Sequence, residues 1–378
     1  MTLAIHELER KKRLAPKQID EFLEKYEFPL VEGASVTFVY RGKADAVLLQ
    51  HFIYGLPTSR PFRRLGSSDL WYLVLDIPPN SRVEYKLNVV KGKDHHWVRD
   101  PLNPYTARDP FGANSVVHSS GHSQPDWTLY DPEARPGELQ DHQLRSTALG
   151  RTQHYKLYLP ARFRTTRRYP LLVLHDGEDY LNFADFKTVL DNLIHRMEVA
   201  PLIVALINSP ARLTEYADDP DHARFVVEEL VPHLDRSLPL IKSPASRGIA
   251  GASFGGVASL STAWRHPGFF GRLLLQSGSF AFTDIGHHKR GPAFDPVVKF
   301  VNAFRDQPGQ PAEKVFVSCG TYESLIYENR SLVPLLQATG MEVRYVEARD
   351  GHNWENWRDR MREGLSWLFP GPLWMVYE

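Results

Sequence analysis

The stretch RGIAGASFGGVASLSTAWRHP, residues 247–267, places a single serine, Ser253, between Gly251 and Gly255. A short apolar run precedes this serine, and a run with helical character follows it. Glycines this close together weaken a strand or a helix, because each loses more backbone entropy on folding than alanine does. The spacing therefore predicts a sharp strand-to-helix turn at Ser253, where flanking side chains would collide with the neighbouring strand and helix.

The chain on both sides of this turn alternates between strand-like and helix-like segments from about residue 144 onward. The apolar runs at 171–174 and 202–207 are typical of strands that are buried on both faces. Segments with helical spacing separate such runs, for example at 186–197 and 222–238. This alternation predicts an α/β fold, a doubly wound and mostly parallel sheet covered by helices.

The N-terminal third has a different pattern. Short strand-like segments such as SVTFVYR and LWYLVLDI follow one another between residues 33 and 120, separated by turn residues. This spacing predicts a small antiparallel β-sandwich, preceded by a helix at residues 19–27. Residues 121–143 are rich in proline, aspartate and glycine and are typical of a linker. We therefore expect a sandwich domain at 1–120, a linker at 121–143 and an α/β domain at 144–378.

Composition excludes several classes of protein. Lysine plus arginine and aspartate plus glutamate each number 45, so no charge excess favours nucleic acid or a membrane surface. The single cysteine, Cys319, excludes an intrachain disulfide and is typical of a reducing compartment. The first residues lack the apolar core of a signal peptide, and no apolar run is long enough to span a bilayer. These features predict a cytoplasmic protein that binds neither nucleic acid nor a membrane.

The turn at Ser253 also has a chemical interpretation. Gly-x-Ser-x-Gly between a strand and a helix is the nucleophile-elbow pattern of α/β-hydrolases. Such a turn exposes the serine Oγ and directs the N–H of the next residue, Phe254, toward a developing oxyanion. A second N–H is expected from the turn after the strand at 171–175, from Gly177 or Glu178. A plain strand-to-helix turn is the alternative interpretation of this second segment.

A serine nucleophile needs a base, and the base needs an orienting acid, in the chain order serine, acid, histidine. His352 lies in the loop between the last strand-like and the last helix-like segment, which is where the base of an α/β-hydrolase is located. Glu323 is the first carboxylate after the strand at 314–320, so we expect it to be the acid. Glu328 and Asp350 remain alternatives, although Asp350 lies two residues before His352 and is better placed to shape its turn.

Several stretches resemble the enterochelin esterase family, a branch of the α/β-hydrolases that opens siderophore trilactones. The resemblance covers about residues 33–369 and is carried by the segments at 68–88, 99–104, 169–181, 251–280 and 350–358. It implies that the N-terminal module is an early-set β-sandwich, and the CGTYES stretch at 319–324 strengthens Glu323 as the acid. One departure is the turn at 175–177, which reads His-Asp-Gly where relatives often have only Asp-Gly.

The resemblance implies a serine esterase with a Ser-His-acid triad and an acyl-enzyme. Its substrate would be an enterobactin-like catecholate trilactone, cut in the cytoplasm to release iron. A ferric siderophore is bulky and anionic, and Arg99, Arg212 and Arg330 are candidates to bind it. We expect no metal or organic cofactor, because HExxH, paired-cysteine and phosphate-loop motifs are absent from the sequence.

Two other functions remain open at this point. Feruloyl and acetylxylan esterases share the Gly-x-Ser-x-Gly-Gly pattern and a similar C-terminal histidine segment, so the chain could be an esterase of that type or a general carboxylesterase. A pseudo-hydrolase that binds an acyl ligand without turnover is the other possibility. The sequence does not specify the oligomeric state.

Overall fold

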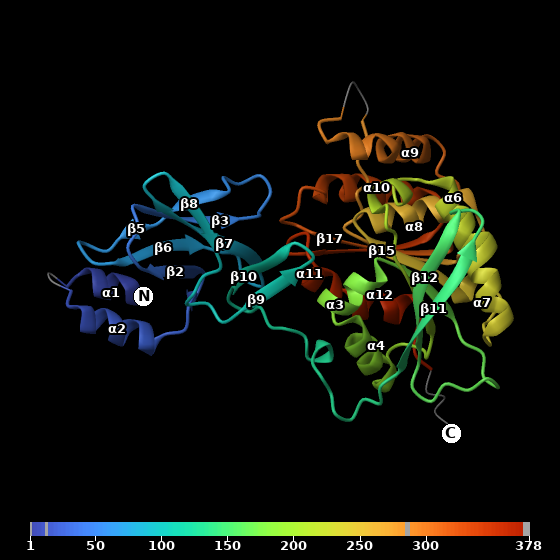
Figure 1. Ribbon diagram of the computed structural model, residues 1–378, viewed down its shortest axis with the longest axis horizontal. Helices are drawn as coiled ribbons and strands as arrows, with labels where there is room; N and C mark the ends of the chain where they lie inside the picture. The colour runs from blue at the N-terminus through green and yellow to red at the C-terminus, as the bar shows by residue number, and fades with distance from the viewer. Residues whose placement is uncertain (1, 12–13, 284–287, 373–378) are drawn as a thin grey trace. The chain divides into compact units, whose positions relative to one another are not determined.

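The computed structural model describes residues 2–11, 14–283 and 288–372, shown in Figure 1. Tertiary contacts divide the chain into two compact units. The sandwich unit consists of Met1–Gln124 together with two short later segments, Thr321–Ser324 and Ala348–Asn353; the α/β unit contains the rest. Among the described residues, no helix has the length and apolarity that a bilayer span requires.

Two antiparallel sheets form the body of the sandwich unit. One sheet has the strand order β1-β2-β6-β5 and the other β4-β3-β7-β10-β9, with β8 paired to β7. The elements of this unit are α1 (Ala4–Glu9), α2 (Pro16–Lys25), β1 (Leu30–Glu32), β2 (Ser35–Arg41), β3 (Ala46–His51), β4 (Ser59–Pro61), β5 (Arg63–Arg64), β6 (Leu70–Asp76), β7 (Arg82–Lys91), β8 (Asp94–Val98), β9 (Thr106–Asp109) and β10 (Gly112–His118).

Strand periodicity explains how this unit builds its cores. On β2, Val36 and Phe38 pack in the cluster between the two sheets, where the Phe38 ring meets the edge of Tyr85 on β7 at 5.0 Å. Val39 faces the other way, into a second cluster formed with Ile5 of α1 and Phe22 of α2. Because successive side chains of a strand point to opposite faces, one sheet serves both cores.

The α/β unit is built on one eight-stranded sheet with the order β11-β12-β14-β13-β15-β16-β17-β18. The pairs among β14, β13, β15, β16 and β17 are parallel, and the β11–β12 and β12–β14 pairs are antiparallel. The elements are η1 (Asp126–Thr128), β11 (Glu138–Ser146), β12 (Arg151–Leu159), β13 (Leu171–His175), α3 (Gly177–Phe183), α4 (Phe186–His195), β14 (Ile203–Ile207), α5 (Arg212–Glu215), α6 (Pro220–Arg224), η2 (Phe225–Leu230), α7 (Val231–Ser237), η3 (Pro244–Ser246), β15 (Arg247–Ala252), α8 (Phe254–Arg265), β16 (Arg272–Gln276), η4 (Pro292–Phe294), α9 (Asp295–Asp306), β17 (Lys314–Gly320), α10 (Ile326–Ala338), β18 (Glu342–Ala348), α11 (Trp354–Asp359) and α12 (Met361–Leu368).

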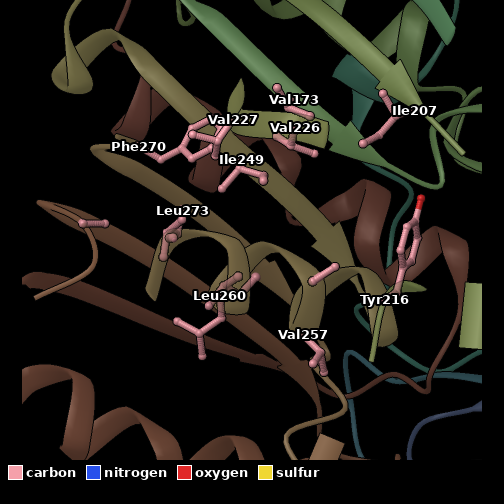
Figure 2. Close-up of a cluster of buried hydrophobic side chains, with 14 of the residues drawn as sticks. Val173, Ile207, Tyr216, Val226, Val227, Ile249, Val257, Leu260, Phe270 and Leu273 are labelled. Atoms are coloured by element: carbon pink, nitrogen blue, oxygen red, sulfur yellow. The ribbon is translucent and has the colours of Figure 1, made fainter. Parts of the chain in front are cut away.

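Helices cover both faces of this sheet, with α8, α9 and α10 on one face and α3, α4 and α12 on the other (Figure 1). Alternate residues of β13 divide between the two cores: Val173 packs under α8, and Leu174 packs on the α4 side. Figure 2 shows part of the first core, with Val257 and Leu260 of α8 close to the strands. Both faces of the strands are therefore apolar, as the sequence predicts, and the expected α/β fold with an antiparallel sandwich is confirmed.

The segment expected to be a linker contains more structure than its composition indicates. Its first part is held on α4, where the side-chain amide of Asn192 donates to the backbone carbonyls of Trp127 and Leu129 at 2.9 and 2.7 Å. Its second part is the beginning of β11. Most side chains of this strand are exposed or half-buried, so its sequence lacks the hydrophobic pattern by which a strand is recognised. The leading helix also begins earlier than expected, with Pro16 in its first turn, and the additional helix α1 precedes it.

Candidate active site

Ser253 occupies the sharp turn between β15 and α8. Its backbone is at φ 57° and ψ −120°, a conformation that side-chain-bearing residues rarely adopt. A Cβ on Gly251 would lie 2.5 Å from the carbonyl carbon of Gly255, so only glycine fits at that position. The helix begins at Phe254, so its N-terminal amides follow the serine directly.

The last residue of β16 and the residues that follow this strand hold the turn. The amide of Ser253 donates to the carbonyl of Gln276 at 3.0 Å, and the amide of Ser279 donates to the carbonyl of Ser253 at 3.1 Å. The hydroxyl of Ser279 also lies 3.1 Å from the Oγ of Ser253, within hydrogen-bonding distance. The turn is thus fixed through its backbone, and the Ser253 side chain has the buried hydroxyl of Ser279 beside it.

The turn after β13 lies against the elbow. A Cβ on Gly255 would be 3.2 Å from the carboxylate of Asp176, whose backbone has a positive φ of 54°. At the next position, a Cβ on Gly177 would be 2.3 Å from the Cβ of Leu206 on β14, which explains the glycine. The amide of Glu178 donates to the side-chain oxygen of Asn208 at 3.1 Å, so of the two expected donors Gly177 is the stronger candidate.

Arg212 fixes the carboxylate of Asp176 by a bidentate ion pair, with N···O distances of 2.8 and 2.7 Å. The same guanidinium lies 3.4 Å from the carbonyl oxygen of Ala252, the residue before Ser253, and 5.9 Å from the ring of Phe254. Its side chain is still 32 % exposed. Arg212 therefore lies at the elbow, where it has a structural partner and an accessible surface.

Two histidines are buried beneath this turn. The Nε2 atoms of His175 and His222 are 3.0 Å apart, and Nδ1 of His175 lies 3.0 Å from the carbonyl oxygen of Ala250. Burial lowers the pKa of His175 to about 4 and also lowers the pKa of His222, because a charged imidazole is poorly solvated there. Both rings are therefore neutral near pH 7 and form part of the packed support of the turn.

The expected acid and base lie together in the sandwich unit, on the loops that follow β17 and β18. Nδ1 of His352 donates to Oε2 of Glu323 at 2.5 Å. The glutamate side chain is 1 % exposed, whereas the histidine side chain is 36 % exposed. A buried carboxylate on Nδ1 orients the ring and leaves Nε2 as the acceptor nitrogen, which is the arrangement that a general base needs.

The two alternative acids have other partners. Glu328 pairs with Arg290. Asp350 is buried, and its Oδ1 accepts hydrogen bonds from Arg82 Nη1 at 3.2 Å, the Gly351 amide at 2.7 Å and Asn353 Nδ2 at 2.8 Å. Desolvation raises the pKa of Asp350 to about 6, against the opposing effect of Arg82. These contacts favour Glu323 as the acid. Asp350 instead stabilises the turn that contains His352, through its hydrogen bonds to Gly351 and Asn353.

The other two candidate arginines have different surroundings. Arg330 forms a bidentate pair with Glu347 at 2.6 Å, and Arg99 donates to the hydroxyl of Thr106 at 2.7 Å. Neither contact connects these residues with Ser253 or His352, so their role in substrate binding stays a prediction. In the described part of the chain, no group of three or more His, Cys, Asp or Glu side chains is arranged to hold a metal ion.

Sequence reasoning did not identify Ser279, Asn208 or Arg82 as parts of the site. Ser279 has a usable signal, since it follows the strand next to the elbow in the stretch LLLQSGSF. Asn208 likewise comes directly after a buried strand, at its carboxyl end. Arg82 carries no local signal, because its partner Asp350 is 268 positions away.

The sheet, the helices on both faces and the serine elbow together define an α/β-hydrolase. Comparison with known proteins agrees with this class and narrows it. A family model described as "Putative esterase" matches residues 146–368. The chain therefore belongs to this esterase family and is an ester hydrolase.

Three similar proteins illustrate the relationship. The iron(III) enterobactin esterase of Escherichia coli (strain K12) is 23 % identical over 329 residues, which cover 80 % of each chain. The enzyme of the same name from Dickeya dadantii is 25 % identical and covers 82 % of this chain and 79 % of its own. A crystal structure of the enterobactin esterase from Shigella flexneri in the presence of enterobactin superposes with a TM-score of 0.75 at 20 % identity, covering 95 % of this chain and 99 % of that one.

Proposed function

We propose that this chain is a serine esterase that hydrolyses the ester bonds of a catecholate trilactone siderophore, such as enterobactin, in the cytoplasm, so that the bound iron can be released. The observation that carries the catalytic part is the buried Glu323 carboxylate on Nδ1 of His352. This pair follows the Ser253 elbow in the chain order that α/β-hydrolases use.

The first half of the reaction forms an acyl-enzyme. Nε2 of His352 accepts the hydroxyl proton as Oγ of Ser253 attacks the ester carbonyl carbon. The carbonyl oxygen becomes an oxyanion, to which the amides of Phe254 and Gly177 donate, with the N-terminus of α8 adding a favourable field. The protonated His352 is stabilised by Glu323 and then donates its proton to the leaving alkoxide, which departs as an alcohol.

The second half restores the serine. A water molecule loses its proton to Nε2 of His352 and attacks the acyl carbon, again through an oxyanion at the same amides. The bond between the acyl carbon and Oγ of Ser253 then breaks, and His352 returns the proton to that oxygen. A trilactone contains three such ester bonds, so three cycles convert it to linear monomers.

The support for the siderophore as substrate comes from relatives and from charge. The enterobactin esterases named above match the chain over both of its compact units, not over the α/β unit alone. A ferric catecholate is anionic, and Arg212 presents a partly exposed guanidinium beside the residue that precedes Ser253. Arg99 and Arg330 are further candidates for this role.

The test compares turnover of four esters by the full-length protein: iron-free enterobactin, ferric enterobactin, a feruloylated sugar and p-nitrophenyl acetate. We expect kcat/KM for the trilactone to exceed that for the feruloylated sugar by about 10²-fold or more, because the relatives that match both compact units are enterobactin esterases. Ser253→Ala is the matched control and should hydrolyse none of the four. A preference for the feruloylated sugar would assign the protein to the carbohydrate-linked esterases instead.

A serine-directed phosphonate separates turnover from ligand binding. The wild-type protein should be labelled covalently at Ser253, and Ser253→Ala should not be labelled. Absence of labelling in the folded wild type, together with absence of turnover, would identify a pseudo-hydrolase.

A further inference from the structure

The loops that carry the acid and the base are bound to the sandwich. Thr321–Ser324 and Ala348–Asn353 group with the sandwich unit although each continues a strand of the α/β sheet. The two loops also contact each other, since the amides of Thr321 and Tyr322 donate to the carbonyls of Ala348 and Asp350 at 2.7 and 3.1 Å. The acid and the base therefore share one support.

Arg82, the first residue of β7, makes the central contact of this support. Its amide donates to the carbonyl of Arg349 at 2.9 Å, and its guanidinium binds Oδ1 of Asp350 at 3.2 Å. The same Asp350 oxygen accepts from residues 351 and 353, the two neighbours of His352. The position of the His352 backbone thus depends on a carboxylate that Arg82 holds from the sandwich.

The acid loop is held in a parallel way through Tyr322, the residue before Glu323. The hydroxyl of Tyr322 lies 2.6 Å from that of Ser81, which immediately precedes Arg82. The carbonyl of Tyr322 accepts from the amide of Tyr54 at 2.8 Å, and its ring packs against the core between the two sandwich sheets. Adjacent residues of the sandwich, Ser81 and Arg82, therefore hold the acid loop and the base loop respectively.

Arg82 and Asp350 are buried, so their contacts restrict the conformation of the loop that carries His352. The side chains of Arg82 and Asp350 are 4 % and 8 % exposed, and Glu84 is a second partner of the guanidinium at 3.0 Å. A buried ion pair is weak evidence for stability, since an apolar pair of similar size often replaces it without loss. Its directional hydrogen bonds do, however, define one loop geometry, and a displacement of about 1 Å at a catalytic group can reduce a rate by roughly 10²-fold.

We propose that Arg82 is a positioning residue of the esterase, which sets the geometry of the His352–Glu323 pair through Asp350, with Ser81 and Tyr322 as the second anchor. The sandwich then serves the chemical step itself, for small esters as well as large ones. This inference rests on the proposed roles of His352 as base and Glu323 as acid.

The experiment measures kcat and KM for p-nitrophenyl acetate with full-length Arg82→Met, Arg82→Lys and Tyr322→Phe. We expect Arg82→Met to lower kcat by roughly 10- to 100-fold with KM within about twofold, because a small ester needs the base but little of the binding surface. Arg82→Lys should recover part of this loss, since it retains a donor and the charge. Tyr322→Phe should lower kcat by about threefold to tenfold, and the rate of phosphonate labelling should fall in parallel in each variant.

Arg41→Met is the matched control. Arg41 lies in the same sandwich and pairs with Asp20 and Asp69, neither of which belongs to the two loops. Its loss should lower the melting temperature and leave kcat within about twofold of wild type. An equal fall in kcat in Arg41→Met and Arg82→Met would show a general effect of a weakened sandwich and would overturn the proposal.

The outcomes also separate this inference from the proposed function. Wild-type kcat in folded Arg82→Met overturns the positioning role alone, provided that His352→Ala is inactive. Wild-type kcat in His352→Ala would instead overturn the proposed function. If Arg82→Met fails to fold, Arg82→Lys and Tyr322→Phe decide: reduced kcat with unchanged KM supports the inference, and wild-type kcat in both contradicts it.

Discussion

The proposed nucleophile and the proposed acid–base pair of this esterase depend on different kinds of contact. The Ser253 elbow depends on neighbours in sequence: Gly251 and Gly255 are four positions apart and meet through their backbones. The His352–Glu323 pair depends on Arg82 and Ser81, whose contacts span 268 and 241 positions. A local backbone turn can be read from a short motif, whereas a pair held by remote side chains cannot.

The difference also determines how each region should fail. At the elbow, an added methyl group meets backbone atoms that cannot move aside, so the fold is affected first. At the acid–base loops, a lost hydrogen bond leaves the strands in place and changes the position of a catalytic side chain. Four predictions test this contrast.

The largest effect is expected when either reacting group is removed. Ser253→Ala and His352→Ala should each lower kcat by about 10³-fold or more with the fold intact, because the attacking oxygen or its base is lost. The double variant should lose little beyond either single one, since the two groups act as a unit. Kinetics on p-nitrophenyl acetate with circular dichroism as the check on folding would measure this, and losses that multiply would contradict a shared role.

Replacing the acid should have the next largest effect. Glu323→Gln keeps the size of the side chain but removes the charge that stabilises protonated His352, so we expect kcat to fall by about 10²- to 10⁴-fold. Glu328→Gln is the matched control, because Glu328 pairs with Arg290 instead. A larger fall in kcat in Glu328→Gln than in Glu323→Gln would show that Glu328, not Glu323, is the acid.

Replacing the elbow glycine Gly251 should lower the stability of the fold. In Gly251→Ala the new Cβ would be 2.5 Å from the Gly255 backbone, and such overpacking costs about 1–3 kcal/mol or more of unfolding free energy. Gly291→Ala is the control. Among the described residues other than its two chain neighbours, no atom lies within 4 Å of a Cβ there, and its φ is −64°. Urea unfolding of both variants measures the contrast, and equal midpoints would remove the steric argument.

The two regions should also respond to pH in opposite directions. His175 and His222 have lowered pKa values, to about 4 for His175, so their contribution to stability is present above pH 6.5 and is lost as the pH falls toward 4. Asp350 has a pKa raised from 3.8 to about 6, so its contribution is present below about pH 4 and is lost as the pH rises through 6.

Variants separate these two contributions in melting temperatures measured between pH 4 and 6.5. Asp350→Asn should make the fall in stability toward pH 4 steeper, and His222→Gln should make it shallower. Each kcal/mol of change in unfolding free energy should shift the melting temperature by about 2–4 °C. Identical slopes in wild type and both variants would show that neither group changes its pKa on folding.

The sequence alone determined much of the α/β unit. Apolar runs such as 171–174 are buried on both faces, and the glycine pattern around Ser253 specifies the elbow, because both depend on residues close together in the chain. The chain order serine, acid, histidine also sufficed to select Glu323 and His352 as candidates, and the structure brings these two side chains into contact.

Only the tertiary structure decided which polar groups meet across long sequence separations. It pairs Arg212 with Asp176, gives Arg330 a different partner in Glu347, and places the acid and base loops on Ser81 and Arg82. The exposed segment Glu138–Ser146 is likewise recognised as strand β11 only from its pairing with β12. Hydrophobic periodicity reports which face of an element is buried, but it carries no information about which charged or hydroxyl group from a distant segment will lie opposite.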